Sequence, residues 1–221
     1  MCLHQRIHAG VYSGEVTTGE TSSAAPAPRA RRLPRQARRQ QILGAATGAF
    51  AAAGFEATGL DDVASSAGIS RAILYRHFDS KAELYRAVLD QARGRLQEAV
   101  GEPPYAERII DDLVTAAAAD PEGFRLLFHH AAREPAFRTE VDRFTAEMTT
   151  VAYHHLAATV PDPAWARWAA NLAPTVTTAA VLAWLDADQP DPKNAPARIR
   201  QAVQGITQAA TGISAHPDRA R

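Results

Sequence analysis

The stretch from Arg38 to Leu89 constrains the fold of this 221-residue chain more than any other part of it. Within it, Val63 and Ala67 are four residues apart and therefore share one face of a short helix. Gly68 follows at the position where a left-handed residue ends a helix at little steric cost. Ser70 comes next and can cap the start of a second helix. This spacing predicts a helix-turn-helix.

The second helix of this unit is predicted over residues 71–77 and is only two turns long. Leu74 and Phe78 are four residues apart and are expected to point inward. The opposite side is cationic and aromatic, with one small residue where the wall of a groove could come close. That side carries Arg71, Ala72, Tyr75 and Arg76. Arginine side chains can donate hydrogen bonds to guanine edges or to phosphates, so this face is suited to a duplex.

The helix after it begins with a capping-box pattern formed by Ser80 and Glu83. Lys81 lies in the first turn of that helix, where the helix dipole disfavours a cation. A phosphate bound at this helix start would account for the lysine.

Taken in order, these motifs resemble the DNA-binding domain of the TetR family of bacterial transcriptional regulators. The matching residues are Gly54-Phe55, Thr58, Val63-Ala64, Ala67-Gly68-Ile69-Ser70, Leu74-Tyr75-Arg76-His77-Phe78 and Lys81-Ala82-Glu83-Leu84. The second threonine of the family's pair is Gly59 here, so one hydroxyl contact to phosphate is lost. The resemblance covers about a quarter of the chain, and it is specific because several spaced motifs agree.

The resemblance implies double-stranded operator DNA as the partner. Tyr75, His77 and Lys81 match family positions that contact phosphate, although His77 could instead cap or pack. Thr58 offers a hydroxyl at a helix start, and Ala72 and Ile73 could touch thymine methyl groups. The predicted DNA-binding residues are Thr58, Ser70, Arg71, Ala72, Ile73, Tyr75, Arg76, His77 and Lys81.

The charge distribution favours the same interpretation although the formal net charge is zero. Residues 29–95 carry 12 basic and 6 acidic side chains, whereas residues 96–221 carry 11 basic and 16 acidic ones. A basic N-terminal part indicates a phosphate-facing surface, with a merely solvated charge run as the alternative. We predict an unstructured arm over residues 1–33 that ends in arginines, whether a natural arm or an over-long start. A helix-turn-helix domain over 34–82 follows it.

The remainder, residues 83–215, is predicted to be a helical effector-binding and dimerisation domain. The fold class is all-α with about nine helices, because no strand pattern and no glycine-rich phosphate loop occurs. The helices are predicted near residues 34–53, 60–67, 71–77, 81–100, 105–119, 121–133, 135–160, 163–187 and 195–212. Pro174 should kink the eighth of these.

Two further properties follow from the resemblance. The last two helices are expected to pair with their twofold mates in a homodimer, with an ordinary intrachain core as the alternative. The middle helices are expected to hold a pocket for an unidentified small-molecule effector, although most of their aromatic residues could be plain core. The candidate pocket residues are Phe124, Phe128, His129, Phe144, Met148, Trp165 and Trp168.

The competing function is a helical metal-dependent or small-molecule enzyme with an incidental helix-turn-helix. One histidine from each of His129-His130 and His154-His155, together with Glu134, could bind a metal. No nucleophile, base and orienting group occur in register, and we predict no catalytic residue, no metal and no cofactor. A constitutive DNA-binding protein whose second domain only dimerises is the third possibility.

The expected location is the cytoplasm, with no membrane partner. Cys2 is the only cysteine, no apolar leader follows Met1, and the most apolar tract, residues 172–185, is too short to span a bilayer. The overall prediction is a ligand-responsive repressor that binds a palindromic operator as a dimer.

Overall fold

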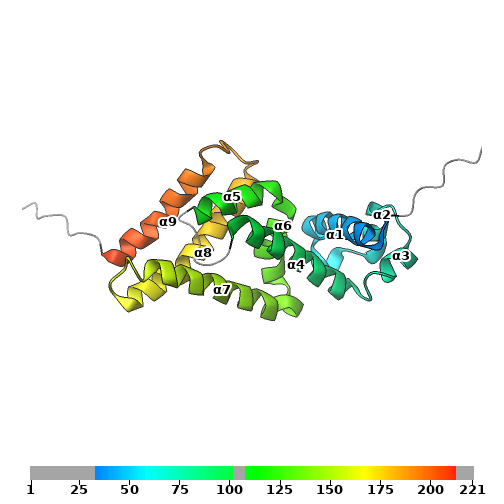
Figure 1. The fold of residues 1–221 in the computed structure, drawn as a ribbon, viewed down its shortest axis with the longest axis horizontal. Coiled ribbons are helices and arrows are strands. Elements are labelled where there is room, and N and C mark those ends of the chain that lie inside the picture. The colour runs from blue at the N-terminus through cyan, green and yellow to red at the C-terminus, as the bar shows by residue number, and fades with distance from the viewer. Residues whose placement is uncertain (1–32, 102–107, 213–221) are drawn as a thin grey trace, which may run out of the picture. The chain divides into compact units, whose positions relative to one another are not determined.

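The computed structural model describes residues 33–101 and 108–212, and every regular element within those ranges is a helix (Figure 1). The first four are α1 (Arg35–Ala57), α2 (Leu60–Ser66), α3 (Arg71–Tyr75) and α4 (Lys81–Val100). The others are α5 (Ile109–Ala119), α6 (Pro121–Arg125), η1 (Leu126–His130), η2 (Ala131–Arg133), η3 (Pro135–Phe137), α7 (Arg138–Leu156), α8 (Pro163–Asp186) and α9 (Ala195–Thr211). The all-α prediction is confirmed. The arginine-rich end of the predicted arm and the start of the helix predicted from residue 105 lie outside the described residues.

Helix α1 buries one apolar stripe, formed by Ile42, Leu43, Ala46 and Phe50. Thr47 is also buried, and its hydroxyl donates to the carbonyl oxygen of Leu43 at 2.9 Å. Gly54 was predicted to end the helix. It interrupts the helix with φ 77°, but helical turns resume as far as Ala57 and carry Phe55 into the core.

The helix-turn-helix has the predicted inward face. Val63, Leu74 and Phe78 are at most 1% exposed. Gly68 has φ 63°, the left-handed conformation that the sequence pattern required. Ser70 is at the N-cap of α3, but its side chain makes no capping hydrogen bond, so that detail of the prediction is wrong.

Helix α3 is shorter than predicted, because it ends at Tyr75. The amide groups of Arg76 and His77 donate to the carbonyl oxygens of Ile73 and Leu74 in a tight turn instead of continuing the helix. The chain therefore turns sharply just after the exposed face, and Phe78 is buried at the end of that turn.

Helix α4 begins and ends as predicted, and it buries one stripe of residues: Leu84, Tyr85, Val88, Leu89, Ala92 and Leu96. The hydroxyl of Ser80 accepts a hydrogen bond from the amide of Glu83 at 3.1 Å. The Glu83 carboxylate accepts from the amide of Asp79 at 2.6 Å, one residue before the cap position of the usual box.

Four aromatic rings join α1, α4 and η3. The ring of Tyr85 lies 4.9 Å from Phe50, 5.0 Å from Phe55 and 4.6 Å from Phe137, measured between centroids. Phe55 also meets Phe137 edge-on at 5.0 Å. The core of the N-terminal helices therefore continues without a break into the η3 turn of the C-terminal part.

The segment predicted as one helix over residues 121–133 is composite. Asp120 caps it as expected, with its carboxylate accepting from the amide of Gly123 at 3.0 Å. The α-helix then gives way to a π-helical turn, η1, and to a 3₁₀ turn, η2. Hydrophobic periodicity over a single turn does not distinguish these hydrogen-bond patterns, which explains the difference.

Helix α8 ends one residue before the predicted end at 187, and its first half turns small residues inward. The buried residues in its first half are Ala166, Ala169 and Ala170, whereas Trp165 and Trp168 are 48% and 40% exposed. By length and composition alone α8 could cross a membrane, and the core helix of a soluble protein passes the same test. It packs against α7 and α9, which gives its inner face protein partners.

Candidate nucleic-acid interface

The exposed side of α3 is held in place by the residues buried beneath it. Leu74 is fully buried, and on either side of it Arg71, Ala72, Tyr75 and Arg76 are exposed. Tyr75 is one of the few large apolar side chains on the surface of the described residues, with 41% of its area exposed. The structure thus brings the predicted cationic and aromatic face together on one helix, while Ile73 lies half-buried at its margin.

Arg71 is oriented by two partners. Its Nη1 donates to Oδ2 of Asp61 on α2 at 2.8 Å, and its Nη2 donates to the hydroxyl of Tyr75 at 3.3 Å. The guanidinium carbon also lies 5.5 Å from the centre of the Tyr75 ring. An arginine is a cation at any working pH, and the hydrogen bond to Tyr75 and the charge of Asp61 raise the pKa of Arg71 further.

A second cationic group surrounds the turn after α3. Arg35, Arg76 and His77 line a hollow of about 360 Å³. Arg39 donates to the carbonyl oxygen of His77 at 3.1 Å and lies over the Phe78 ring at 4.3 Å. Partial burial lowers the pKa of His77, and the nearby arginines at 35, 39 and 38 lower it further. A phosphate group would offset the repulsion among these arginines.

Lys81 has a partner that the sequence did not reveal. Its ammonium donates to the carbonyl oxygens of Phe55 at 2.8 Å and Glu56 at 3.1 Å, and it lies 4.5 Å from the centre of the Phe55 ring. These carbonyls belong to the last turn of α1, where a cation is favoured by the helix dipole. The unfavourable position of Lys81 at the start of α4 is therefore explained by its contact with the end of α1, without a phosphate.

Replacing Lys81 by methionine is expected to lower the free energy of unfolding by about 1–2 kcal/mol, because two charge-assisted hydrogen bonds are lost. Urea denaturation measures this change, and Lys193→Met, at an exposed lysine between α8 and α9, is the matched control. An unchanged stability, together with a DNA affinity that depends less steeply on salt, would instead identify Lys81 as a phosphate contact.

Thr58 also faces inward. It is 4% exposed, and its hydroxyl lies 2.7 Å from the carbonyl oxygen of Gly54 and 3.2 Å from that of Ala49, to which it donates. The start of α2 is instead capped by Asp62, whose Oδ2 accepts from the amide of Gly59 at 3.1 Å. The Thr58 hydroxyl thus closes the end of α1, and the exposed part of the interface consists of α3 and the cationic turn after it.

The aromatic residues predicted for an effector pocket fall into two groups. Phe124 meets Phe128 at 4.5 Å, and Phe128 meets Phe144 at 5.7 Å, so these three form one run from α6 through η1 to α7. Trp165 and Trp168 stack edge-on at 5.4 Å on the surface of α8. The two tryptophans therefore do not line an interior pocket of a single chain, because α8 turns its alanine face inward.

The other two predicted pocket residues lie near the first group. Met148 is half-buried on α7, and His129 is half-buried on η1, with a ring nitrogen 2.8 Å from Nη1 of Arg133. Within residues 33–101 and 108–212, no three histidine, cysteine or acidic side chains are grouped to hold a metal. The histidine pairs thus form no such cluster in this part of the chain.

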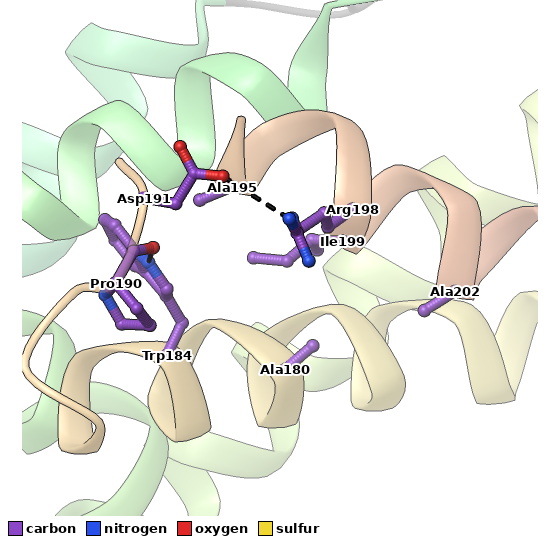
Figure 2. A pocket seen from close by; sticks show the side chains of 8 residues that line it. All are labelled: Ala180, Trp184, Pro190, Asp191, Ala195, Arg198, Ile199 and Ala202. Carbon is purple, nitrogen blue, oxygen red and sulfur yellow. Dashed lines mark hydrogen bonds and ion pairs between the residues drawn. The ribbon is translucent and has the colours of Figure 1, made fainter. Parts of the chain in front are cut away.

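A hollow that no sequence pattern predicted lies between α8 and α9 (Figure 2). Its volume is about 380 Å³ and its wall is mostly apolar; it is lined by Ala180, Trp184, Pro190, Asp191, Ala195, Arg198, Ile199 and Ala202. Nε1 of Trp184 donates to the Pro190 carbonyl at 2.9 Å, and Arg198 pairs with Asp191 at 3.4 Å. None of the residues predicted for the effector pocket lines it.

Comparison with known proteins decides the family. The sequence profile described as "Bacterial regulatory proteins, tetR family" matches residues 42–88, which span most of the helix-turn-helix unit. The HTH-type transcriptional activator FasR of Mycolicibacterium smegmatis is 30% identical over 208 residues, covering 90% of this chain and 92% of that protein. The chain belongs to the TetR family of transcriptional regulators. It is therefore a transcriptional regulator and not an enzyme, and the competing enzymatic prediction is wrong.

Other transcriptional regulators are similar over part of the chain. The HTH-type transcriptional repressor KstR2 of Rhodococcus jostii is 37% identical over 84 residues, which is 36% of this chain and 41% of that protein. A TetR-like transcriptional regulator from Rhodococcus sp. has the same fold, with a TM-score of 0.71 and 23% identity over 82% of this chain and all of that one. FadR of Bacillus subtilis, solved in complex with stearoyl-CoA, has a TM-score of 0.59 and 17% identity over 76% of this chain and 97% of that one.

Proposed function

We propose that this TetR-family protein is a cytoplasmic, effector-responsive repressor that binds a near-palindromic operator as a homodimer. The observation that carries the proposal is the exposed face of α3, on which Arg71 and Tyr75 are fixed by hydrogen bonds and by the buried Leu74. An arginine oriented in this way suits the edge of a guanine in the major groove. The hollow lined by Arg35, Arg76 and His77 suits a phosphate of the same duplex.

One copy of so short a helix offers few contacts, and this favours a dimer with two half-sites. In each subunit we assign residues 34–82 to DNA binding and residues 83–215 to effector binding and dimerisation. The exposed faces of α8 and α9 support the pairing surface. On α8 they carry the stacked Trp165 and Trp168, and on α9 they carry the small residues Ala202, Gly205 and Ala209 at helical spacing. Small residues let two helices approach closely, and exposed tryptophans are common at interfaces.

Replacing Gly205 by leucine is expected to turn the dimer into monomers without harming the subunit. An added Cβ at Gly205 would meet nothing within 4 Å in one chain, and removing a helical glycine favours the helix. A partner helix packed there would be pushed away. Gly44→Leu is the control, because Gly44 is also an exposed helical glycine with open space. Analytical ultracentrifugation measures the mass, and a variant that remains dimeric would argue against this pairing surface.

For the effector we propose an apolar small molecule bound beside the aromatic run of Phe124, Phe128 and Phe144 in the C-terminal domain. FadR binds stearoyl-CoA, and this fold neighbour makes stearoyl-CoA a reasonable first probe. The route to DNA would pass through η1 and η3, because both pack against α1 and α4. A ligand that binds better when the two heads are wrongly spaced for the operator would release DNA.

The test begins with selection of bound sequences from a random duplex pool by the full-length protein. We expect a near-palindromic site, bound by a dimer in gel shifts at fixed salt and released by a suitable ligand. Selection of no sequence would refute operator recognition. Activation is the second candidate, because the relative aligned over nearly the whole chain is named an activator. A reporter placed behind the selected site separates the two, since a repressor lowers its expression and an activator raises it.

A further inference from the structure

Asp61 lies beside the arginine of α3 without belonging to α3. It occupies the first turn of α2, and its Oδ2 accepts from Nη1 of Arg71 at 2.8 Å. The side chains of the pair are 69% and 57% exposed, so the ion pair lies on the surface and not in the core. An exposed pair of this kind contributes little to stability. Because the pair lies on the face that we assign to DNA, we consider a role in DNA recognition instead of one in stability.

The geometry limits how the Arg71 guanidinium can move. Asp61 holds Nη1 from α2, and the Tyr75 hydroxyl holds Nη2 from the next turn of α3. A guanidinium has five N–H groups, and these two hydrogen bonds use two of them. The three that remain exceed the two that a guanine edge accepts through O6 and N7. Arg71 therefore has enough N–H groups left to donate to a base without giving up either protein partner.

We propose that Asp61 is a positioning residue for operator specificity, which holds Arg71 in the orientation that reads one guanine in each half-site. This inference rests on the proposed function, because it requires that α3 enters the major groove. A freely rotating arginine can reach phosphates and several bases, and fixing it loses side-chain entropy on binding. The ion pair with Asp61 orders the side chain before DNA arrives. It also places a carboxylate where non-cognate contacts to phosphate would be repelled.

Replacing Asp61 by alanine should therefore lower base discrimination and raise the affinity for unrelated duplex. Discrimination between the selected guanine and the other bases at the Arg71 position should fall about 5- to 10-fold, because Arg71 is no longer held to one orientation. Affinity for unrelated duplex should rise about 2- to 5-fold, because one negative charge per subunit is removed near the phosphates. Asp61→Asn keeps an acceptor without the charge, so it should retain an intermediate degree of discrimination.

The experiment compares binding constants of the full-length dimer for the selected operator and for its single-base variants, at one salt concentration. Asp79→Ala is the matched control. It removes an exposed carboxylate from the same part of the chain, and the ion pair of Arg71 is with Asp61, not with Asp79. The Asp61→Ala change is also made in an Arg71→Ala background, where its effect on discrimination should disappear. Thermal unfolding of each variant checks that the helices remain folded.

Three results would overturn the inference. Discrimination at that base pair could be unchanged in Asp61→Ala. The Asp61→Ala variant could change the preference at a base pair other than the one that Arg71→Lys affects. Asp61 would then be a direct reader of a cytosine amino group. The effect could persist when Arg71 is already alanine. If the unaltered protein selects no sequence at all, the proposed function fails instead, so the two failures are distinguishable.

Discussion

Replacing Arg71 by alanine is expected to weaken binding to the selected operator by on the order of 30- to 10⁴-fold. A bidentate contact to guanine contributes about 1–3 kcal/mol, and a dimer loses two of them, one in each half-site. Affinity for unrelated duplex should fall far less, since non-specific binding depends on the whole cationic surface. Gel shifts with the selected operator and with a scrambled duplex measure both effects.

The salt dependence of binding shows which kind of contact Arg71 makes. A base-reading arginine leaves the slope of log affinity against log salt nearly unchanged, whereas each lost phosphate contact reduces it by about one. Arg93→Ala is the control, because Arg93 lies on α4 away from the exposed face of α3. An Arg71→Ala protein that keeps its preference for the selected operator would refute the assignment of α3 as the reading helix.

Replacing Phe50 by alanine is expected to lower the free energy of unfolding by about 3–5 kcal/mol, the range found for removing a buried phenylalanine. Phe50 is completely buried, and its ring lies 4.9 Å from that of Tyr85 and 6.3 Å from that of Phe55. The cavity would open at the junction of α1 and α4, where the DNA-binding helices meet the rest of the chain. Urea denaturation followed by circular dichroism measures the change.

The control for the Phe50→Ala variant truncates a large apolar residue on the surface instead of one in the core. Leu33 is 45% exposed, so Leu33→Ala should change stability by less than about 0.5 kcal/mol. A Phe50→Ala protein as stable as the unaltered one would show that the aromatic cluster does not hold the helix-turn-helix against α4. Operator binding by the same variant is expected to weaken, because Leu74 and Phe78, which anchor α3 and the turn after it, belong to the same core as Phe50.

Local features of the helix-turn-helix could be predicted because each depends on near neighbours in the chain. A left-handed residue was needed between α2 and α3, and Gly68 provides it. The fourfold spacing of Leu74 and Phe78 placed them inward and left Arg71 and Tyr75 outside. The bounds of α4 were correct because its ends are also marked by local residues.

Roles that depend on distant partners could not be predicted. Lys81 looked like a phosphate ligand until the end of α1, 25 residues earlier, was found to accept its hydrogen bonds. Thr58 looked available until its hydroxyl was found to donate to α1. Asp61 carried no signal, because no pattern within either helix shows that α2 brings a carboxylate to Arg71.

By itself, the sequence determined the helical class, the order of the helices and the residues exposed on α3. Periodicity and capping are properties of short segments, and they leave little choice where apolar residues form one narrow stripe. Only the tertiary structure decided which face of α8 turns inward, because that helix is apolar on several sides. Packing against α7 and α9 buries the alanines in the first half of α8 and leaves Trp165 and Trp168 on the surface.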